Sequence, residues 1–205
     1  MESGPHGHKT WQGASAEHAA KRTRAAAPEA ARIREGKMEK LRIGIIMGGM
    51  SSEREVSLNS GRNVHDNLDP ELYEAIPVFM DGEGRLWVIP WQLVSQNTTL
   101  DIFDHLEGEA RRIAYEDLKK EIDFAFISLH GKYGDDGCIQ GLLELLNLPY
   151  TGPGVLASAL GMDKHIQQKI LMSEGIDVPR SMVITARDWE EKRDSVRKEV
   201  LERFS

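Results

Sequence analysis

The chain has 205 residues, of which 40% are hydrophobic and 29% are charged, and its formal net charge is −7. This length holds one domain, or one domain and part of a second. No apolar run approaches the roughly 18 residues that a membrane span needs, so we expect no membrane partner. The single cysteine, Cys138, excludes an internal disulfide and favours a reducing, cytoplasmic compartment.

Residues 1–37 differ from the rest of the chain in charge and in composition. Their seven basic and four acidic residues give +3, which leaves −10 for the remainder, and such an acidic body argues against a nucleic-acid partner. After Met1 their only large apolar residues are Trp11 and Ile33, too few to offset the entropy of ordering. We predict a disordered or non-native N-terminal extension over 1–37 and a native start at Met38. The alternative is a targeting peptide, which the glutamates of this segment and its lack of an apolar stretch disfavour.

A regular pattern of strands and helices begins at Leu41. β-Branched and apolar runs predict strands, and apolar residues at helical spacing predict helices. Pro77 in the second strand implies a sheet edge or an irregularity, because proline cannot donate a ladder hydrogen bond. The first half of the pattern comprises a strand at Ile43–Met47, a helix at Glu55–Leu68, a strand at Ala75–Met80 and a returning hairpin strand at Arg85–Ile89.

The second half of the chain repeats this alternation, after a polar stretch between Asn97 and Lys120 with weak periodicity. It comprises a strand at Phe124–Leu129, a helix carrying Ile139, Leu142, Leu143 and Leu146, a short helix around Leu156, a helix from Asp163 to Gly175, a strand at Ser181–Thr185 and a final helix that Thr185 caps. The alternation predicts an α/β fold with an open, mostly parallel sheet and helices on both faces.

Two glycine-containing segments follow predicted strands, at 48–53 and at 130–137. The ends of parallel strands meet at one edge of the sheet, where α/β folds place their ligand crevice, so we expect the two segments to form one site. Ser51 or Ser52 is a candidate helix cap. The first segment lacks the lysine of a phosphate-binding loop and the glycine spacing of a dinucleotide fingerprint, and offers Glu53 instead.

The chemistry-bearing residues each have two open interpretations. Glu53 suits an ammonium group, or it is a solvated acid in the first turn of a helix. His130 suits a phosphate or carboxylate, or it is an ordinary loop histidine. Lys164 lies in the first turn of a helix, where the dipole disfavours a cation, so it faces an anion such as ATP phosphate, or it is an ordinary solvated lysine. Asp135 and Asp136 are better explained as turn residues than as cation ligands, and we interpret Cys138 as a small packing residue.

Taken together, several stretches resemble the N-terminal part of D-alanine–D-alanine ligases, which are ATP-grasp enzymes. The resemblance runs from about Leu41 to the end of the chain. The residues that carry it are Gly48-Gly49-Met50-Ser51-Ser52-Glu53-Arg54-Glu55-Val56-Ser57-Leu58, His130-Gly131 through Gly137, Gln140-Gly141-Leu142-Leu143-Glu144, Pro149-Tyr150-Thr151-Gly152 and Ser158-Ala159-Leu160-Gly161-Met162-Asp163-Lys164.

The resemblance implies a reaction and a set of site residues. ATP, with Mg²⁺ or Mn²⁺, would phosphorylate the carboxylate of one D-alanine, and the amine of a second D-alanine would attack the acyl phosphate to give a dipeptide for peptidoglycan synthesis. Glu53 would hold the ammonium of the first D-alanine, and Val56 would contact its methyl group. His130 would lie near its carboxylate and the transferred phosphoryl group, and Lys164 would contact an ATP phosphate. A homodimer is also implied.

The resemblance also divides the chain into domains. We expect a Rossmann-like pre-ATP-grasp domain at 38–160 and the first strand and helix of a truncated ATP-grasp central domain at 161–205. Because family members continue further, to residues that bind most of the ATP and the metal, we expect this chain to be an inactive fragment by itself. The alternatives are a non-catalytic α/β dimerisation or binding module, or a ligase that takes another second substrate such as D-lactate.

Overall fold

The computed structural model describes residues 33–34 and 37–205. Within the segment predicted to be an extension, β1 (Ile33–Arg34) pairs antiparallel with β2 (Lys37–Met38). The remainder of that prediction falls on residues outside the described ones.

The main sheet has five strands in the order β6-β5-β4-β3-β7. Its centre is parallel, because β3 (Leu41–Gly48) pairs with β4 (Tyr73–Met80) on one side and with β7 (Phe124–Ile127) on the other. The short strands β5 (Leu86–Val88) and β6 (Arg111–Ile113) add an antiparallel edge. The predicted open α/β sheet is thus confirmed as a mixed sheet, with the predicted hairpin at β4–β5.

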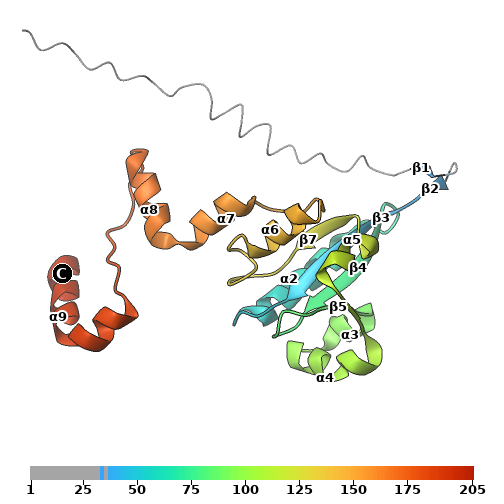
Figure 1. Cartoon of the computed structure of the whole chain (residues 1–205), viewed down its shortest axis with the longest axis horizontal. Helices are drawn as coiled ribbons and strands as arrows, with labels where there is room; N and C mark the ends of the chain where they lie inside the picture. Colours follow the sequence, from blue (N-terminus) through green and yellow to red (C-terminus); the bar gives the residue numbers. More distant parts are fainter. Residues whose placement is uncertain (1–32, 35–36) are drawn as a thin grey trace, which may run out of the picture.

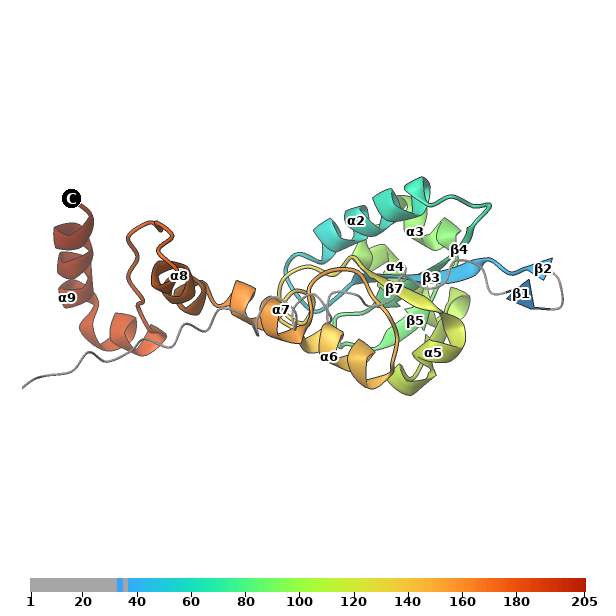
Figure 2. The same ribbon diagram turned by 90° about the horizontal axis from the view of Figure 1, so that it is seen from above.

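Helices cover both faces of this sheet, as Figure 2 shows. One face carries α2 (Arg54–Asn67), α3 (Trp91–Gln96) and α4 (Thr99–Glu109); the other carries α5 (Leu118–Glu121), which follows the 3₁₀ turn η1 (Tyr115–Asp117), and α6 (Cys138–Leu145). Side chains of β3 alternate between two apolar cores, with Ile43, Ile45 and Met47 on the α2 side and Ile46 on the α6 side. This alternation is the period of two that a strand buried on both faces must have.

Helix α2 sits unusually close to the central strand. A Cβ added to Gly61 would lie 2.9 Å from the sulfur of Met47, so a side chain at this position would force Met47 to shift. At the start of the helix, the backbone N–H of Gly48 donates a hydrogen bond to Ser57 Oγ at 2.9 Å. These two contacts fix the position of α2 over the end of β3, where the candidate site lies.

Pro77 does not mark an edge, because β4 lies between β3 and β5. Its carbonyl accepts a hydrogen bond from the N–H of Ile89, just beyond the last β5 residue in the ladder, Val88. The N–H and C=O of a strand residue point to the same side, so the missing proline donor faces the place where the β4–β5 ladder stops. Pro77 is therefore accommodated where the β4–β5 hydrogen-bond ladder ends, and not on an edge strand of the sheet.

The last part of the chain forms three helices, α7 (Val155–Met162), α8 (Lys164–Ser173) and α9 (Ala186–Phe204), which lead away from the sheet in Figure 1. The strand predicted at Ser181–Thr185 is wrong: these residues have no regular structure, although Thr185 caps α9 as predicted. A strand needs a neighbour for its backbone hydrogen bonds, and no described strand lies beside this segment. Across the described residues, no helix has both the length and the apolar character to cross a membrane.

Candidate functional site

The ends of β3 and β7 bring the two predicted site segments together. Because these strands are parallel neighbours, Gly48 and Ile127 lie toward the same edge of the sheet. Beyond that edge Ser51 Oγ donates a hydrogen bond to the backbone carbonyl of His130 at 2.7 Å, and accepts one from the N–H of Glu53 at 3.1 Å. A single hydroxyl therefore links the two segments directly.

The turn between β3 and α2 requires glycine. Gly48 and Gly49 have φ values of 89° and 103°, in the left-handed region, and a Cβ on Gly48 would lie 2.5 Å from the carbonyl oxygen of Met80. The turn delivers Glu53 as the N-cap residue of α2, without a side-chain capping bond. The prediction that Ser51 or Ser52 caps this helix is therefore wrong, although Ser51 does bind the N–H of the capping residue.

The carboxylate of Glu53 lies against the backbone of the second segment. A Cβ added to Gly131 would be 2.9 Å from Glu53 Oε2 and 3.3 Å from Ser51 Oγ, and Gly131 has a φ of 69°. Among the described residues no group donates a hydrogen bond to this carboxylate or forms an ion pair with it. The arrangement leaves an acid at the rim that is free to bind a cationic group.

His130 is held at both ends by serine hydroxyl groups. Ser51 binds its backbone carbonyl, and Ser60 Oγ lies 2.9 Å from the ring nitrogen Nε2. In the described part of the chain the other ring nitrogen, Nδ1, has no hydrogen-bond partner, and the side chain is half-buried. The ring can therefore offer Nδ1 to a ligand.

One face of α2 runs along this site. Glu53, Val56 and Ser60 are spaced i, i+3 and i+7, which puts them on the same side of the helix. Val56 is 56% exposed, so it is an apolar side chain with no protein packing over much of its surface. The helix thus presents a carboxylate, an isopropyl group and a hydroxyl in a row.

The acids of the 130–137 loop hold the loop itself. Asp135 accepts a hydrogen bond from the N–H of Gly131 at 2.7 Å, and Asp136 accepts bonds from the N–H groups of Tyr133 and Cys138 at 2.8 and 3.1 Å. Although its partial burial acts in the opposite direction, these hydrogen bonds lower the pKa of Asp136. The two carboxylates are turn residues, as expected.

Cys138 is exposed, so its interpretation as a packing residue is wrong. It begins α6, a position that commonly lowers a thiol pKa. Here its hydrogen bond with Asp136 and, secondarily, burial raise the pKa of the thiol. A raised pKa lowers the fraction of thiolate at neutral pH, so we expect this thiol to react slowly despite its exposure.

Lys164 lies apart from the other candidates. It is the first residue of α8, and its Nζ donates a hydrogen bond to the carbonyl of Gly161 in the last turn of α7 at 2.7 Å. A cation is favoured at a helix C-terminus, so this contact explains a lysine at a position that α8 itself disfavours. Figure 1 shows α7 between α8 and the sheet, so the structure does not bring Lys164 to the Glu53–His130 rim.

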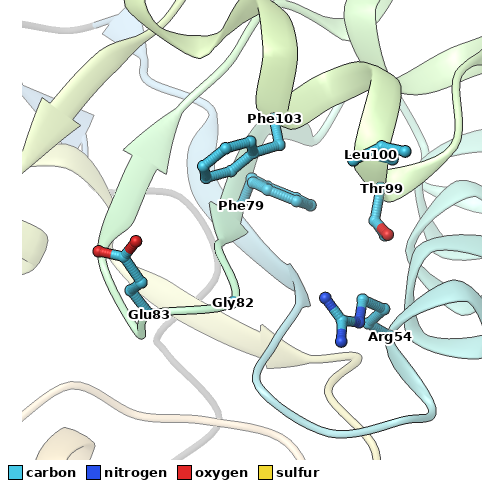
Figure 3. A pocket seen from close by; sticks show the side chains of 7 residues that line it. All are labelled: Arg54, Phe79, Gly82, Glu83, Thr99, Leu100 and Phe103. Atoms are coloured by element: carbon cyan, nitrogen blue, oxygen red, sulfur yellow. The ribbon is translucent and has the colours of Figure 1, made fainter.

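A cavity lies beside the start of α2, between that helix, the β4–β5 turn and α4. It has a volume of about 290 Å³, and Figure 3 shows the Arg54 guanidinium below the rings of Phe79 and Phe103. Its lining residues are Arg54, Phe79, Gly82, Glu83, Thr99, Leu100 and Phe103. None of the residues predicted from the sequence lines this cavity, which is therefore a separate concavity next to the site. Within the described residues, no group of three or more His, Cys, Asp or Glu side chains could hold a metal ion.

The sequence profile described as "D-ala D-ala ligase N-terminus" matches residues 42–153. The chain belongs to the D-alanine–D-alanine ligase family. The match contains Glu53, Val56 and His130, whereas Lys164 lies outside it. The D-alanine–D-alanine ligase of Pelotomaculum thermopropionicum is 40% identical over 148 residues, which are 72% of this chain and 37% of that relative.

Solved structures of ligases agree with this fold. The D-alanine–D-alanine ligase from Coxiella burnetii is 36% identical with a TM-score of 0.67, and the alignment covers 81% of this chain and 49% of that one. The ligase from Bacillus anthracis, solved in complex with ATP, is 35% identical with a TM-score of 0.53, covering 78% of this chain and 43% of that one. This ligase-family chain therefore spans between about a third and a half of the length of its relatives.

Three residues of the site were missed by sequence reasoning. Ser60 binds the ring of His130, Gly131 carries the contact with Glu53, and Ser51 was considered only as a cap. The helical spacing of Ser60 from Glu53 is visible in the sequence, but its pairing with a histidine 70 positions later is not.

Proposed function

We propose that this chain carries the first D-alanine site of a D-alanine–D-alanine ligase. The whole enzyme would join two D-alanines at the expense of ATP, for peptidoglycan synthesis. One observation carries the proposal: the Glu53 carboxylate has no partner in the described residues, and its Oε2 lies where a Cβ on Gly131, the residue after His130, would be only 2.9 Å away. An amino acid is a zwitterion, and it needs an acid and a hydrogen-bond donor a few ångströms apart.

The residues of the site have distinct roles in this proposal. Glu53 accepts charge-assisted hydrogen bonds from the substrate ammonium, which are shorter and stronger than neutral ones. His130 donates from its ring to the substrate carboxylate, and stabilises the negative charge on that group while it is phosphorylated. Val56 packs against the methyl group. Gly131 leaves room for the Glu53 carboxylate at the required place.

The proposed reaction has two steps, formation of an acyl phosphate and its attack by an amine. An oxygen of the first substrate's carboxylate attacks the γ-phosphorus of ATP, so that an acyl phosphate forms and ADP leaves. The amine of the second D-alanine then attacks the acyl carbon, a C–N bond forms, phosphate leaves and the amine loses a proton. The described residues of this chain contribute by fixing the first substrate in place, and positioning of the reactants is one of the two main sources of catalysis in phosphoryl transfer.

The family implies Mg²⁺ or Mn²⁺, but the described residues do not fit such an ion, since no cluster of three ligands exists among them. Lys164 is the proposed contact to an ATP phosphate, and it would have to leave the Gly161 carbonyl to make it. We therefore expect the 205-residue polypeptide to bind D-alanine without producing the dipeptide. A cytoplasmic location, where the single cysteine stays reduced, is part of this proposal.

The test is a titration of D-alanine into the isotope-labelled chain, followed by NMR. Glu53→Gln removes the charge and keeps the shape, and Glu83→Gln is the matched control at another exposed glutamate. We expect saturable shifts near Glu53 and His130 that weaken by roughly tenfold or more in Glu53→Gln and persist in Glu83→Gln. If Glu53→Gln bound D-alanine with the same affinity as Glu83→Gln, the proposed role of Glu53 would be refuted.

A second candidate is a non-catalytic dimerisation module, because α4 exposes two large apolar residues. Leu100 is 68% exposed and Phe103 is 43% exposed, next to the cavity of Figure 3. Sedimentation equilibrium of the isolated chain tests whether it self-associates. A monomer at all concentrations argues against a dimerising role, whereas a dimer would also support the homodimer that the family resemblance implies.

A further inference from the structure

The hydroxyl of Ser60 makes one hydrogen bond with the described residues, and its partner is a candidate site residue. Its hydroxyl lies 2.9 Å from His130 Nε2. A serine within a helix commonly donates to the carbonyl four residues earlier, but Ser60 makes no such bond with Val56 or with any other described residue. Its hydroxyl proton is thus available to the imidazole.

A neutral imidazole has one nitrogen that donates and one that accepts, and its surroundings select which is which. If Nε2 carried the proton, Nδ1 would turn a lone pair toward the ligand. A carboxylate would be repelled by that lone pair. If Ser60 donates to Nε2, the ring proton stays on Nδ1, and the side that has no protein partner becomes a hydrogen-bond donor.

We propose that Ser60 is a positioning residue that donates its hydroxyl proton to Nε2 of His130, so that the neutral ring presents an Nδ1–H to the carboxylate of a bound amino acid. This inference rests on the proposed function for the identity of the ligand. The tautomer itself does not depend on any ligand, and can be measured separately.

The position of the Ser60 hydroxyl is fixed by its neighbours on α2. Gly61 packs directly on Met47, and Ser57 accepts the N–H of Gly48, so the helix cannot roll on the sheet without losing one of these contacts. At the other end, Ser51 binds the carbonyl of His130. The imidazole is therefore held between a fixed backbone and a fixed hydroxyl, which is the arrangement that orients a ring before a ligand arrives.

The experiment measures the tautomer of His130 in the full chain by long-range ¹H–¹⁵N correlation, at a pH where the ring is neutral. The variants are Ser60→Ala, which removes the hydroxyl, and Ser60→Thr, which keeps it. Ser52→Ala is the control, since Ser52 is exposed in the same turn. Backbone amide spectra establish that each variant is folded.

We expect the proton on Nδ1 in the parent chain, in Ser60→Thr and in Ser52→Ala. Ser60→Ala should shift the ring to the Nε2–H tautomer that free histidine prefers, and weaken D-alanine binding by about tenfold. An Nε2–H ring in the parent chain, or an unchanged tautomer in Ser60→Ala, would overturn the inference. If the tautomer changes as expected but the parent chain binds no D-alanine, the proposed function fails, and with it the ligand named in this inference, while the Ser60–His130 coupling stands.

Discussion

Replacement of Gly131 by alanine separates the stability of the site loop from its proposed ligand binding. Gly131 has a φ of 69°, where a residue with a side chain is disfavoured by about 1–2 kcal/mol. The new Cβ would also lie 2.9 Å from Glu53 Oε2, so the carboxylate must retreat by about 0.5 Å to reach the ordinary contact distance of 3.4 Å.

These two costs should appear in different measurements. Glu53 is exposed and has no partner among the described residues, so its carboxylate moves at little cost to folding. The free energy of unfolding should fall only by the backbone cost, which lowers Tm by roughly 2–8 °C. D-Alanine affinity should fall by about tenfold or more, because the displaced carboxylate loses a charge-assisted hydrogen bond to the ammonium.

Gly175→Ala is the matched control. Gly175 has a similar φ of 75°, and no atom lies within 4 Å of its added Cβ. It should show a comparable backbone cost by chemical denaturation and unchanged D-alanine affinity in an NMR titration. Equal D-alanine affinity in Gly131→Ala and in the parent chain would refute the argument that Gly131 makes room for a ligand-binding carboxylate.

Three further predictions concern the surroundings of the site. Asp81→Asn should lower the free energy of unfolding in urea by about 2 kcal/mol at pH 7, because a buried carboxylate that accepts hydrogen bonds from Arg85 and Trp87 loses its charge. Burial opposes the shift, but these bonds lower the pKa of Asp81, so its stabilisation is complete above the unfolded pKa of about 3.9 and is lost as the pH falls through the lower folded pKa. An equal loss of stability in acid for the parent and the variant would contradict this prediction. Alkylation of Cys138 by iodoacetamide at pH 8 should be slower than alkylation of a free thiol, and it should be faster in Asp136→Asn than in the parent chain. Equal rates in Asp136→Asn and the parent would show that Asp136 does not cause the raised thiol pKa. Val56→Ala should weaken D-alanine binding by about 1 kcal/mol in the same titration and leave Tm unchanged, since this side chain is exposed; a fall in Tm would show a packing role.

The long, apolar strands and the amphipathic helices could be predicted because their patterns are local. β3 is buried on both faces and reads as a continuous apolar run, and Ile139, Leu142 and Leu143 mark the buried side of α6. The common edge reached by 48–53 and 130–137 follows from the parallel pairing of β3 and β7. The order of strands and helices along the chain is thus enough to predict that the two segments lie at the same edge of the sheet.

Short elements and special pairings could not be predicted in the same way. β6 has three residues and begins with two exposed arginines, so its sequence does not show the alternation of apolar and polar residues that predicts a strand. The segment at Ser181–Thr185 has the composition of a strand, but pairing with a neighbour decides whether a strand forms. Pro77 predicted an edge or an irregularity, and the sequence could not decide between them because the end of a ladder is defined by the partner strand and not by the proline.

The proximity of the two site segments was predicted from the sequence, whereas the contacts between them were not. Glu53 and His130 could be singled out because each lies in a glycine-containing segment that follows a predicted strand, and the family resemblance gave each a role. The hydroxyl of Ser60 and the hydrogen-bonding of Ser51 depend on distances between segments far apart in the chain. Such contacts are properties of the folded structure, and a single sequence holds no local signal for them.

A crystal structure of this chain with D-alanine tests the central claim most directly. The account predicts the ammonium within about 2.7–3.2 Å of a Glu53 carboxylate oxygen, the methyl group against Val56 and the carboxylate at Nδ1 of His130. D-Alanine bound in the cavity of Figure 3, with its carboxylate on Arg54 and no contact to Glu53, would contradict it.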